Sequence, residues 1–81
     1  MRGIDTRDLL ILSILTEGGH LTRLTGIRVF DIHMDRKYDA TYRRLHRLER
    51  IGYVARGFIN GNSNTYYITQ KGIDFIKEAV L

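Results

Sequence analysis

The sequence predicts an α+β fold that is mostly helical, and three observations support this prediction. Proline is absent, and glycines separate three successive segments that carry helical signals. Two short segments rich in Tyr, Val, Ile and Thr then flank a polar Asn-Gly turn, a pattern typical of a β-hairpin. A last helical segment follows the hairpin. This order is that of a winged helix-turn-helix, with three helices, a two-stranded β-hairpin wing and a C-terminal helix in one domain over residues 1–81.

The first predicted helix is capped by Asp5 or Thr6 and ends near Gly18-Gly19. Its run LLILSIL, residues 9–15, is apolar on more than one face, whereas a surface helix has a single apolar stripe. Such a helix must be buried on two sides, and in so short a chain we expect another subunit to cover the second side. The predicted homodimer interface consists of Leu9, Leu10, Leu12, Ile76 and Val80.

The next segment predicts a short extended piece within residues 20–25 and then a second helix. This helix starts at Thr22 or Thr25, a choice that stays open because Gly26 is costly inside a helix but harmless in its first turn. Its predicted inner face consists of Leu24, Ile27, Phe30 or Asp31, and Met34.

The second half of the chain holds the third helix, the hairpin and the last helix. The third helix runs from about Asp39 to Ile51, with Asp39 or Tyr38 at its cap, and Gly52 ends it. Residues 53–58 and 65–69 are the predicted strands, joined by the tip INGNSN, and Thr69 caps the last helix.

Positive charge is concentrated in one part of the chain. The whole sequence carries a net charge of +4, with a pI near 9.8. The segment 36–56 alone carries +5, so the remaining 60 residues carry −1. A segment with such a high net positive charge favours a polyanionic partner.

The third helix separates into two faces when its residues are placed 100° apart. Its buried face consists of Thr41, Leu45, Leu48 and Ile51. Its outward face carries Asp39, Arg43, His46 and Arg50, with Tyr42 and Glu49 on one edge and Ala40 and Arg47 on the other. Arg44 falls inside the apolar arc, where we expect it to extend beside Leu48 or to pair with a carboxylate such as Asp31 or Asp35.

Basic helix faces are often only solvated surfaces, but this one follows a short turn and precedes a hairpin. In helix-turn-helix proteins the second helix of the pair enters the major groove with its N-terminus first. We therefore predict a sequence-specific double-stranded DNA-binding protein, a homodimeric transcription regulator with its wing on the adjacent backbone. Arg43 is the favoured base contact, Arg47 a phosphate contact, and Arg50 a complement to the helix dipole. The predicted DNA-binding residues are Arg36, Lys37, Asp39, Ala40, Tyr42, Arg43, His46, Arg47, Arg56, Asn60, Asn62 and Asn64.

Two other functions stay open: a winged-helix protein-interaction module, and a nonspecific architectural DNA-binding protein. An enzyme is not predicted, because no nucleophile–base arrangement, P-loop or paired acid is visible. Neither a cofactor nor a metal is expected, since His20, His33 and His46 lie on separate elements without a carboxylate cluster. The sequence has no cysteine, no apolar run near the roughly 20 residues of a membrane span, and no signal-peptide cleavage site. We expect a cytoplasmic protein without a membrane partner.

Two stretches resemble the winged-helix transcriptional regulators of the PadR and MarR kind: TYRRLHRLERIGYVAR and YYITQKGIDFIKE. The first matches their Leu-Glu-x-x-Gly-hydrophobic-Val/Ile pattern at residues 48–54, and the second their Leu-Thr-x-x-Gly pattern at residues 68–72. Tyr42 and Gly26 also match positions that are common in PadR-like proteins. The resemblance covers nearly the whole chain and implies a DNA-binding regulator, usually a homodimer on a pseudo-palindromic site.

Overall fold

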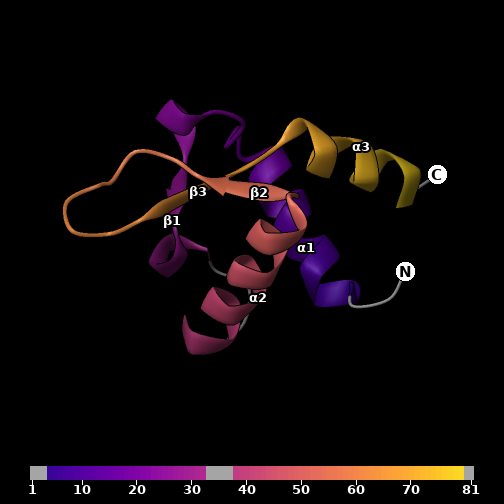
Figure 1. Cartoon of the computed structure of the whole chain (residues 1–81), viewed down its shortest axis with the longest axis horizontal. Helices are drawn as coiled ribbons and strands as arrows, with labels where there is room; N and C mark the ends of the chain where they lie inside the picture. The colour runs from indigo at the N-terminus through magenta and orange to yellow at the C-terminus, as the bar shows by residue number, and fades with distance from the viewer. Residues whose placement is uncertain (1–3, 33–37, 80–81) are drawn as a thin grey trace.

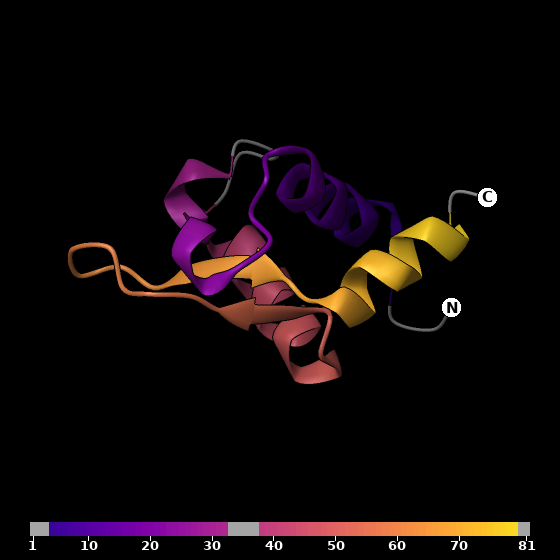
Figure 2. The same ribbon diagram turned by 90° about the horizontal axis from the view of Figure 1, so that it is seen from above.

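The computed structural model describes residues 4–32 and 38–79. In these residues three α-helices, α1 (Thr6–Glu17), α2 (Tyr38–Ile51) and α3 (Gln70–Ala79), pack against a small antiparallel sheet (Figure 1). The sheet is formed by β1 (Ile27–Arg28), β2 (Val54–Arg56) and β3 (Thr65–Ile68). Two 3₁₀ turns, η1 (Arg23–Thr25) and η2 (Val29–Asp31), flank β1. The loop between β2 and β3 extends away from α3 as a wing (Figure 2).

The start of α1 is a reciprocal cap, which confirms Asp5 as its N-cap residue. The Asp5 carboxylate accepts a hydrogen bond from the Asp8 N–H at 3.0 Å, and the Asp8 carboxylate accepts one from the Asp5 N–H at 3.1 Å. The helix ends at Glu17, with Gly18 as its cap and Gly19 in the left-handed region, as the sequence predicts.

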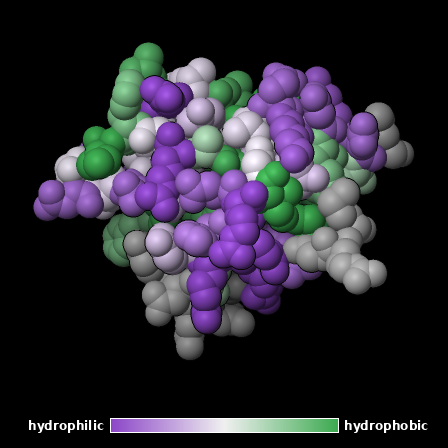
Figure 3. Space-filling view, viewed as in Figure 1, coloured by the Kyte–Doolittle hydropathy of each residue, from purple (hydrophilic) through white to green (hydrophobic). Residues whose placement is uncertain are grey.

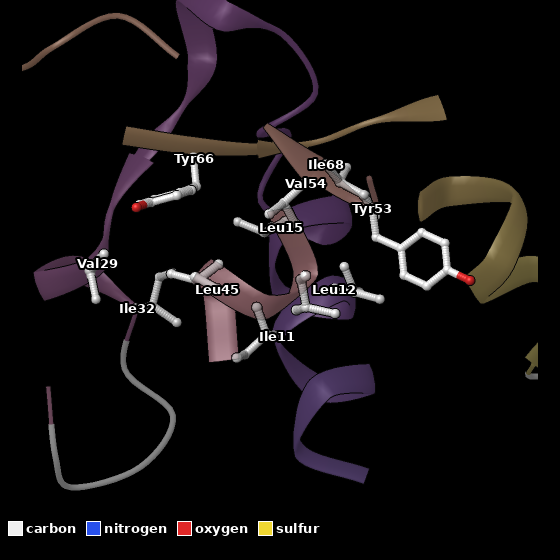
Figure 4. Close-up of a cluster of buried hydrophobic side chains, with 11 residues drawn as sticks. Ile11, Leu12, Leu15, Val29, Ile32, Leu45, Tyr53, Val54, Tyr66 and Ile68 are labelled. Atoms are coloured by element: carbon white, nitrogen blue, oxygen red, sulfur yellow. The ribbon is translucent and has the colours of Figure 1, made fainter. Parts of the chain in front are cut away.

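The part of α1 that carries Ile11, Leu12 and Leu15 is covered by its own chain. The helix contacts α2, α3 and β3, and Ile11, Leu12 and Leu15 have no exposed surface. Figure 4 shows these three side chains in the cluster that also holds Leu45 and Ile68. Leu12 therefore has no surface left for a partner subunit, which corrects its place in the predicted dimer interface. Among the other predicted interface residues, Leu10 is exposed, Leu9 and Ile76 are half-buried, and Val80 lies outside the described residues.

The predicted second helix is wrong over the described residues. Residues 23–31 form η1, β1 and η2 instead, and Leu24 and Phe30 are 81% and 72% exposed rather than inward. Leu24, Ile27 and Phe30, whose spacing of three residues suggested a helix, lie on η1, β1 and η2 in turn. Gly26 marks the cause, because a Cβ there would lie 2.6 Å from Thr65 Oγ1, where this strand approaches β3. Of the inner-face residues predicted for this helix, Met34 lies outside the described part of the chain.

The sheet has the strand order β1-β3-β2, and β3 forms its centre. Tyr66 pairs with Ile27 on one side and Arg56 on the other. The β2–β3 pair confirms the predicted hairpin, which continues to a bridge between Asn60 and Ser63 around Gly61 at φ +65°. The third strand, β1, lies just beyond the extended piece predicted within residues 20–25.

The end of α2 and the start of α3 are joined through one threonine. Gly52, at φ +101°, ends α2, and its N–H donates to Leu48. The Thr69 hydroxyl donates to the Gly52 carbonyl at 2.6 Å and accepts from the Gly72 N–H at 3.1 Å. Thr69 is thus the N-cap of α3, as predicted, and it also sets where α3 leaves the sheet.

Candidate nucleic-acid interface

The two faces predicted for α2 are present in the structure. Leu45 and Leu48 have no exposed surface, and Thr41 is also buried. The opposite face is exposed over Tyr42, Arg43, His46, Arg47 and Arg50. Hydrophilic atoms accordingly cover α2 in the space-filling view (Figure 3). The exposed side chains line a shallow hollow of about 420 Å³, and the rings of Tyr42 and His46 lie 6.1 Å apart within it.

Two of the four arginines of α2 pair with the first turn of α1. Arg44 donates from Nη1 to both carboxylate oxygens of Asp5, at 2.8 and 2.9 Å, and reaches Asp8 at 3.3 Å. The Arg47 guanidinium donates from Nη2 to the other carboxylate oxygen of Asp8. Asp8 has no exposed surface, so its charge is compensated by two guanidinium groups and by the Asp5 N–H. The structural role predicted for Arg44 is confirmed, but its described partners are Asp5 and Asp8 rather than Asp31, and Asp35 lies outside the described residues.

The pairing changes the titration of Asp5. Hydrogen bonds from the Arg44 side chain and from the Asp8 N–H lower the pKa of Asp5 from 3.8 to about 2. The pKa of Arg44 is raised in turn, chiefly by its hydrogen bonds to Asp5. The carboxylate of Asp5 therefore stays charged in the folded protein under conditions that protonate it in the unfolded chain.

An Asp5→Asn variant should be less sensitive to acid than the parent. Because the pKa of Asp5 is lower in the folded state, its stabilising contribution is complete above about pH 4 and is lost as the pH falls toward 2. Asparagine keeps the helix cap but cannot titrate. Urea unfolding of both proteins at pH 5, 4, 3 and 2 measures the effect. If the free energy of unfolding falls equally steeply in both proteins, Asp5 does not make this contribution.

The other arginines near α2 differ in their partners. Arg43 and Arg50 make no ion pair with any residue that the structure describes. Arg56, at the base of the wing, pairs with Glu49 at 3.1 Å, and the Coulombic attraction of Glu49 raises the pKa of Arg56. The charge that faces outward without a described carboxylate partner therefore centres on Arg43 and Arg50, with Arg47 shared between Asp8 and solvent.

The wing meets the N-terminal half of α2 across a second hollow of about 420 Å³. Asn62, Ser63 and Asn64 line it from the wing, and Tyr42 lines it from α2. Arg28 and Phe30 complete its wall, and Arg28 is held by Asp31 at 2.8 Å. The sequence reasoning missed Arg28 and Phe30, because they lie outside the basic segment and only the pairing of β1 with β3 brings them to the wing.

The predicted DNA-binding residues thus fall into three groups. Ala40, Tyr42, Arg43, His46 and Arg47 share one surface of α2, and Asn62 and Asn64 lie across from Tyr42. Arg56 and Asn60 lie on the hairpin, where Asn60 holds the bridge to Ser63. Arg36, Lys37 and the side chain of Asp39 lie outside what the structure describes.

The two histidines that the structure describes, His20 and His46, lie on separate segments of the chain. Within residues 4–32 and 38–79, no three His, Cys, Asp or Glu side chains come together in a possible metal site. His20 is bonded through Nδ1 to the Thr25 carbonyl at 2.6 Å, and His46 lies on α2 beside Tyr42. His33 lies outside the described residues. None of the helices in the described part of the chain is long and apolar enough to cross a membrane.

Comparison with solved structures places this arrangement among winged-helix proteins. TubR from Bacillus megaterium pBM400 superposes with a TM-score of 0.84 at 20% sequence identity, over 98% of this chain and 89% of TubR. A point mutant of S. aureus MepR superposes with a TM-score of 0.77 at 19% identity, over 93% of this chain and 55% of MepR. Both neighbours are winged-helix DNA-binding regulators. No protein-family model and no curated protein matches the sequence. The winged-helix fold predicted from the order of elements is confirmed.

Proposed function

We propose that this protein is a sequence-specific double-stranded DNA-binding regulator that acts as a homodimer. The observation that carries the proposal is the outward face of α2, where Arg43 and Arg50 stand beside Tyr42 and His46 with no described carboxylate partner. The wing lies next to the N-terminal half of this helix. The fold shared with two DNA-binding regulators supports the same conclusion.

In this proposal α2 enters the major groove with its N-terminal half deepest. Ala40, Tyr42 and Arg43 face the base edges, and the Arg43 guanidinium reads a guanine through two hydrogen bonds. The Asn62 and Asn64 amides of the wing meet the adjacent sugar–phosphate backbone. Arg47 is 44% exposed although it is bonded to Asp8, so part of its guanidinium remains available to a phosphate at the edge of the groove. Arg36, Lys37 and Asp39 remain candidates on sequence grounds.

The proposed dimer surface lies at the end of the molecule away from the wing. Leu9 and Leu10 of α1 and Ile76 of α3 contribute apolar surface there. A hollow of about 350 Å³ lies between the two helices, lined by Ile4, Leu9, Phe75, Glu78 and Ala79. A second copy packed against this surface would point two α2 helices at one duplex, with half-sites about 34–36 Å apart or a multiple of that spacing.

Selection from random DNA duplexes tests the proposed function directly. The expected result is a recurring inverted repeat with half-sites about one helical turn apart, roughly 10 base pairs. Salt-dependent binding without a recurring sequence would instead support an architectural role. An absence of salt-dependent binding would leave the protein-interaction module as the function.

Replacing Arg43 by alanine should weaken binding to the selected site by about 1–3 kcal/mol and relax the preference at one base position. The cause is the loss of a bidentate base contact from an exposed side chain that does not support the core. Lys77→Ala is the matched control, because it removes one positive charge from the exposed surface of α3. Fluorescence anisotropy on the selected site and on single-base variants measures both effects. Equal binding by Arg43→Ala and Lys77→Ala would contradict the placement of α2 in the groove.

A further inference from the structure

A second exposed surface lies on the far side of the sheet from α2. Four large exposed apolar side chains come from η1, from the residues just before it and from the first half of the wing: Leu21, Leu24, Phe58 and Ile59. Leu24 is 81%, Ile59 67% and Phe58 55% exposed. Hydrophobic atoms accordingly gather at the upper left of Figure 3, over η1 and the wing. We call these four residues the η1–wing patch.

The η1–wing patch is held together by backbone contacts. The Phe58 N–H donates to the Arg23 carbonyl at 3.1 Å, so the wing is bonded to the 3₁₀ turn. The Phe58 carbonyl accepts from Thr65 Oγ1 at 2.6 Å, which fixes the same residue to β3. A Cβ on Gly57 would lie 2.7 Å from the Arg23 carbonyl oxygen, so the two segments are in close contact. These hydrogen bonds and this close contact therefore fix the backbone that carries the patch.

The charged residues of the segments that build the η1–wing patch are all basic. The segments that build it, residues 18–30 and 57–64, contain no Asp or Glu. Arg23 lies exposed between Leu21 and Leu24 in the sequence and makes no ion pair with a residue that the structure describes. Arg28, the other arginine of these segments, is paired with Asp31 and lines the hollow on the α2 side of the wing.

We propose that the η1–wing patch binds an acidic segment of a partner protein that also carries large apolar side chains. Leucine or phenylalanine of the partner would cover Leu24, Phe58 and Ile59, and a carboxylate would pair with Arg23. Exposed apolar side chains grouped in this way are typical of interaction sites rather than of free surface. The patch has four residues, far fewer than the roughly 20–30 that each side of a stable protein–protein interface contributes, so it fits a peptide-sized segment and a transient contact. This inference goes beyond the proposed DNA binding and does not depend on it.

Charge complementarity favours this occupant over two others. A second copy of this chain would bring another patch without carboxylates, so Arg23 would meet Arg23 in a symmetric contact. DNA would satisfy Arg23, but it offers no apolar surface on its backbone to cover Leu24 and Phe58. A partner segment that combines carboxylates with apolar side chains satisfies both kinds of group at once.

Selection of random 12-residue peptides displayed on phage, with the purified full chain as bait, tests the proposal. The selected peptides are expected to be enriched in Asp and Glu together with Leu, Phe, Ile or Trp. One selected peptide is then synthesised with a fluorescent label. It should bind the Phe58→Ser and the Arg23→Gln variants at least about tenfold more weakly than it binds the parent protein. Phe30→Ser is the matched control, because Phe30 is an exposed phenylalanine too, at 72% against 55% for Phe58, but lies on η2, outside the patch.

Several results would overturn the proposal. These are no enrichment of acidic peptides, an enrichment of basic ones, or equal losses in Phe58→Ser and Phe30→Ser. A weaker affinity of Phe58→Ser for duplex DNA would assign the patch to the DNA interface. A change in the molar mass of Phe58→Ser by light scattering would assign it to contacts between copies. The affinity for DNA is measured separately. A negative result in the peptide selection therefore does not contradict the proposed DNA-binding function.

Discussion

An Asp8→Ala variant is expected to lose about 2–4 kcal/mol of unfolding free energy. Asp8 is fully buried and joins three groups: the Asp5 N–H, Arg44 and Arg47. Its removal opens half of the capping box and leaves two guanidinium groups beside a site without charge. The total stability of a small domain is about 5–15 kcal/mol, so the variant should unfold at clearly lower urea concentration.

A second substitution separates the contribution of the Asp8 charge to stability from that of its hydrogen bonds. Asp8→Asn keeps an acceptor for the Asp5 N–H but removes the charge, so it should be less destabilised than Asp8→Ala. Asp74→Ala is the matched control, since Asp74 is exposed on α3, where its described partner is the Gln70 side chain. This control should change stability by less than about 1 kcal/mol. If Asp8→Ala were as stable as Asp74→Ala, the buried carboxylate would not support the fold.

Gly72→Ala is the second substitution with a large expected effect, a loss of about 2–3 kcal/mol. Alanine is normally preferred over glycine inside a helix by about 1 kcal/mol, so the expected sign is opposite to helix propensity. A Cβ at position 72 would lie 2.3 Å from the Tyr53 carbonyl oxygen and 2.7 Å from Ile68 Cγ1. The carbonyl cannot retreat without breaking its hydrogen bond from the Thr69 N–H at 3.0 Å.

Gly18→Ala provides the comparison for Gly72→Ala. Gly18 has φ −81°, which any residue adopts, and the closest backbone atom to a Cβ there, the Ile14 carbonyl oxygen, would lie 3.1 Å away. The nearer atoms belong to the His20 ring, and moving this side chain costs its hydrogen bond to the Thr25 carbonyl but no backbone contact. We expect Gly18→Ala to change the midpoint of thermal unfolding far less than Gly72→Ala. Similar midpoints for the two variants would mean that the α3 junction tolerates a methyl group.

The sequence predicts best where local signals and burial agree. The caps at Asp5 and Thr69, the end of α2 at Gly52 and the hairpin all follow from short-range rules, and the structure confirms them. The helical angle of Arg44 also predicted a structural role. Its partners could not be predicted, because Asp5 and Asp8 lie 36 to 39 residues away and a helical angle gives a direction but no neighbour.

Two expectations failed because they depended on tertiary contacts. The apolar run of α1 correctly indicates burial on two sides, but α2, α3 and β3 supply the cover, so Leu12 needs no partner subunit. The second helix was inferred from apolar residues spaced three apart, but these lie on η1, β1 and η2, and the sequence does not show the close approach of Gly26 to Thr65. The η1–wing patch was missed for the same reason, since Leu24 was assigned to the inner face of that helix.

The ion pairs between α2 and the start of α1 decide which arginines of α2 remain exposed once the domain has folded. A peptide of residues 38–51, or a nascent chain, would present all four arginines of this segment to any polyanion. Folding withdraws Arg44 and shares Arg47 with a buried carboxylate. Unfolded molecules should therefore adhere to nucleic acid less selectively than folded ones. If the proposed DNA binding holds, the packing of α1 on α2 would reduce nonspecific attraction to polyanions and would leave the selection of a DNA site to the side chains that remain exposed on α2.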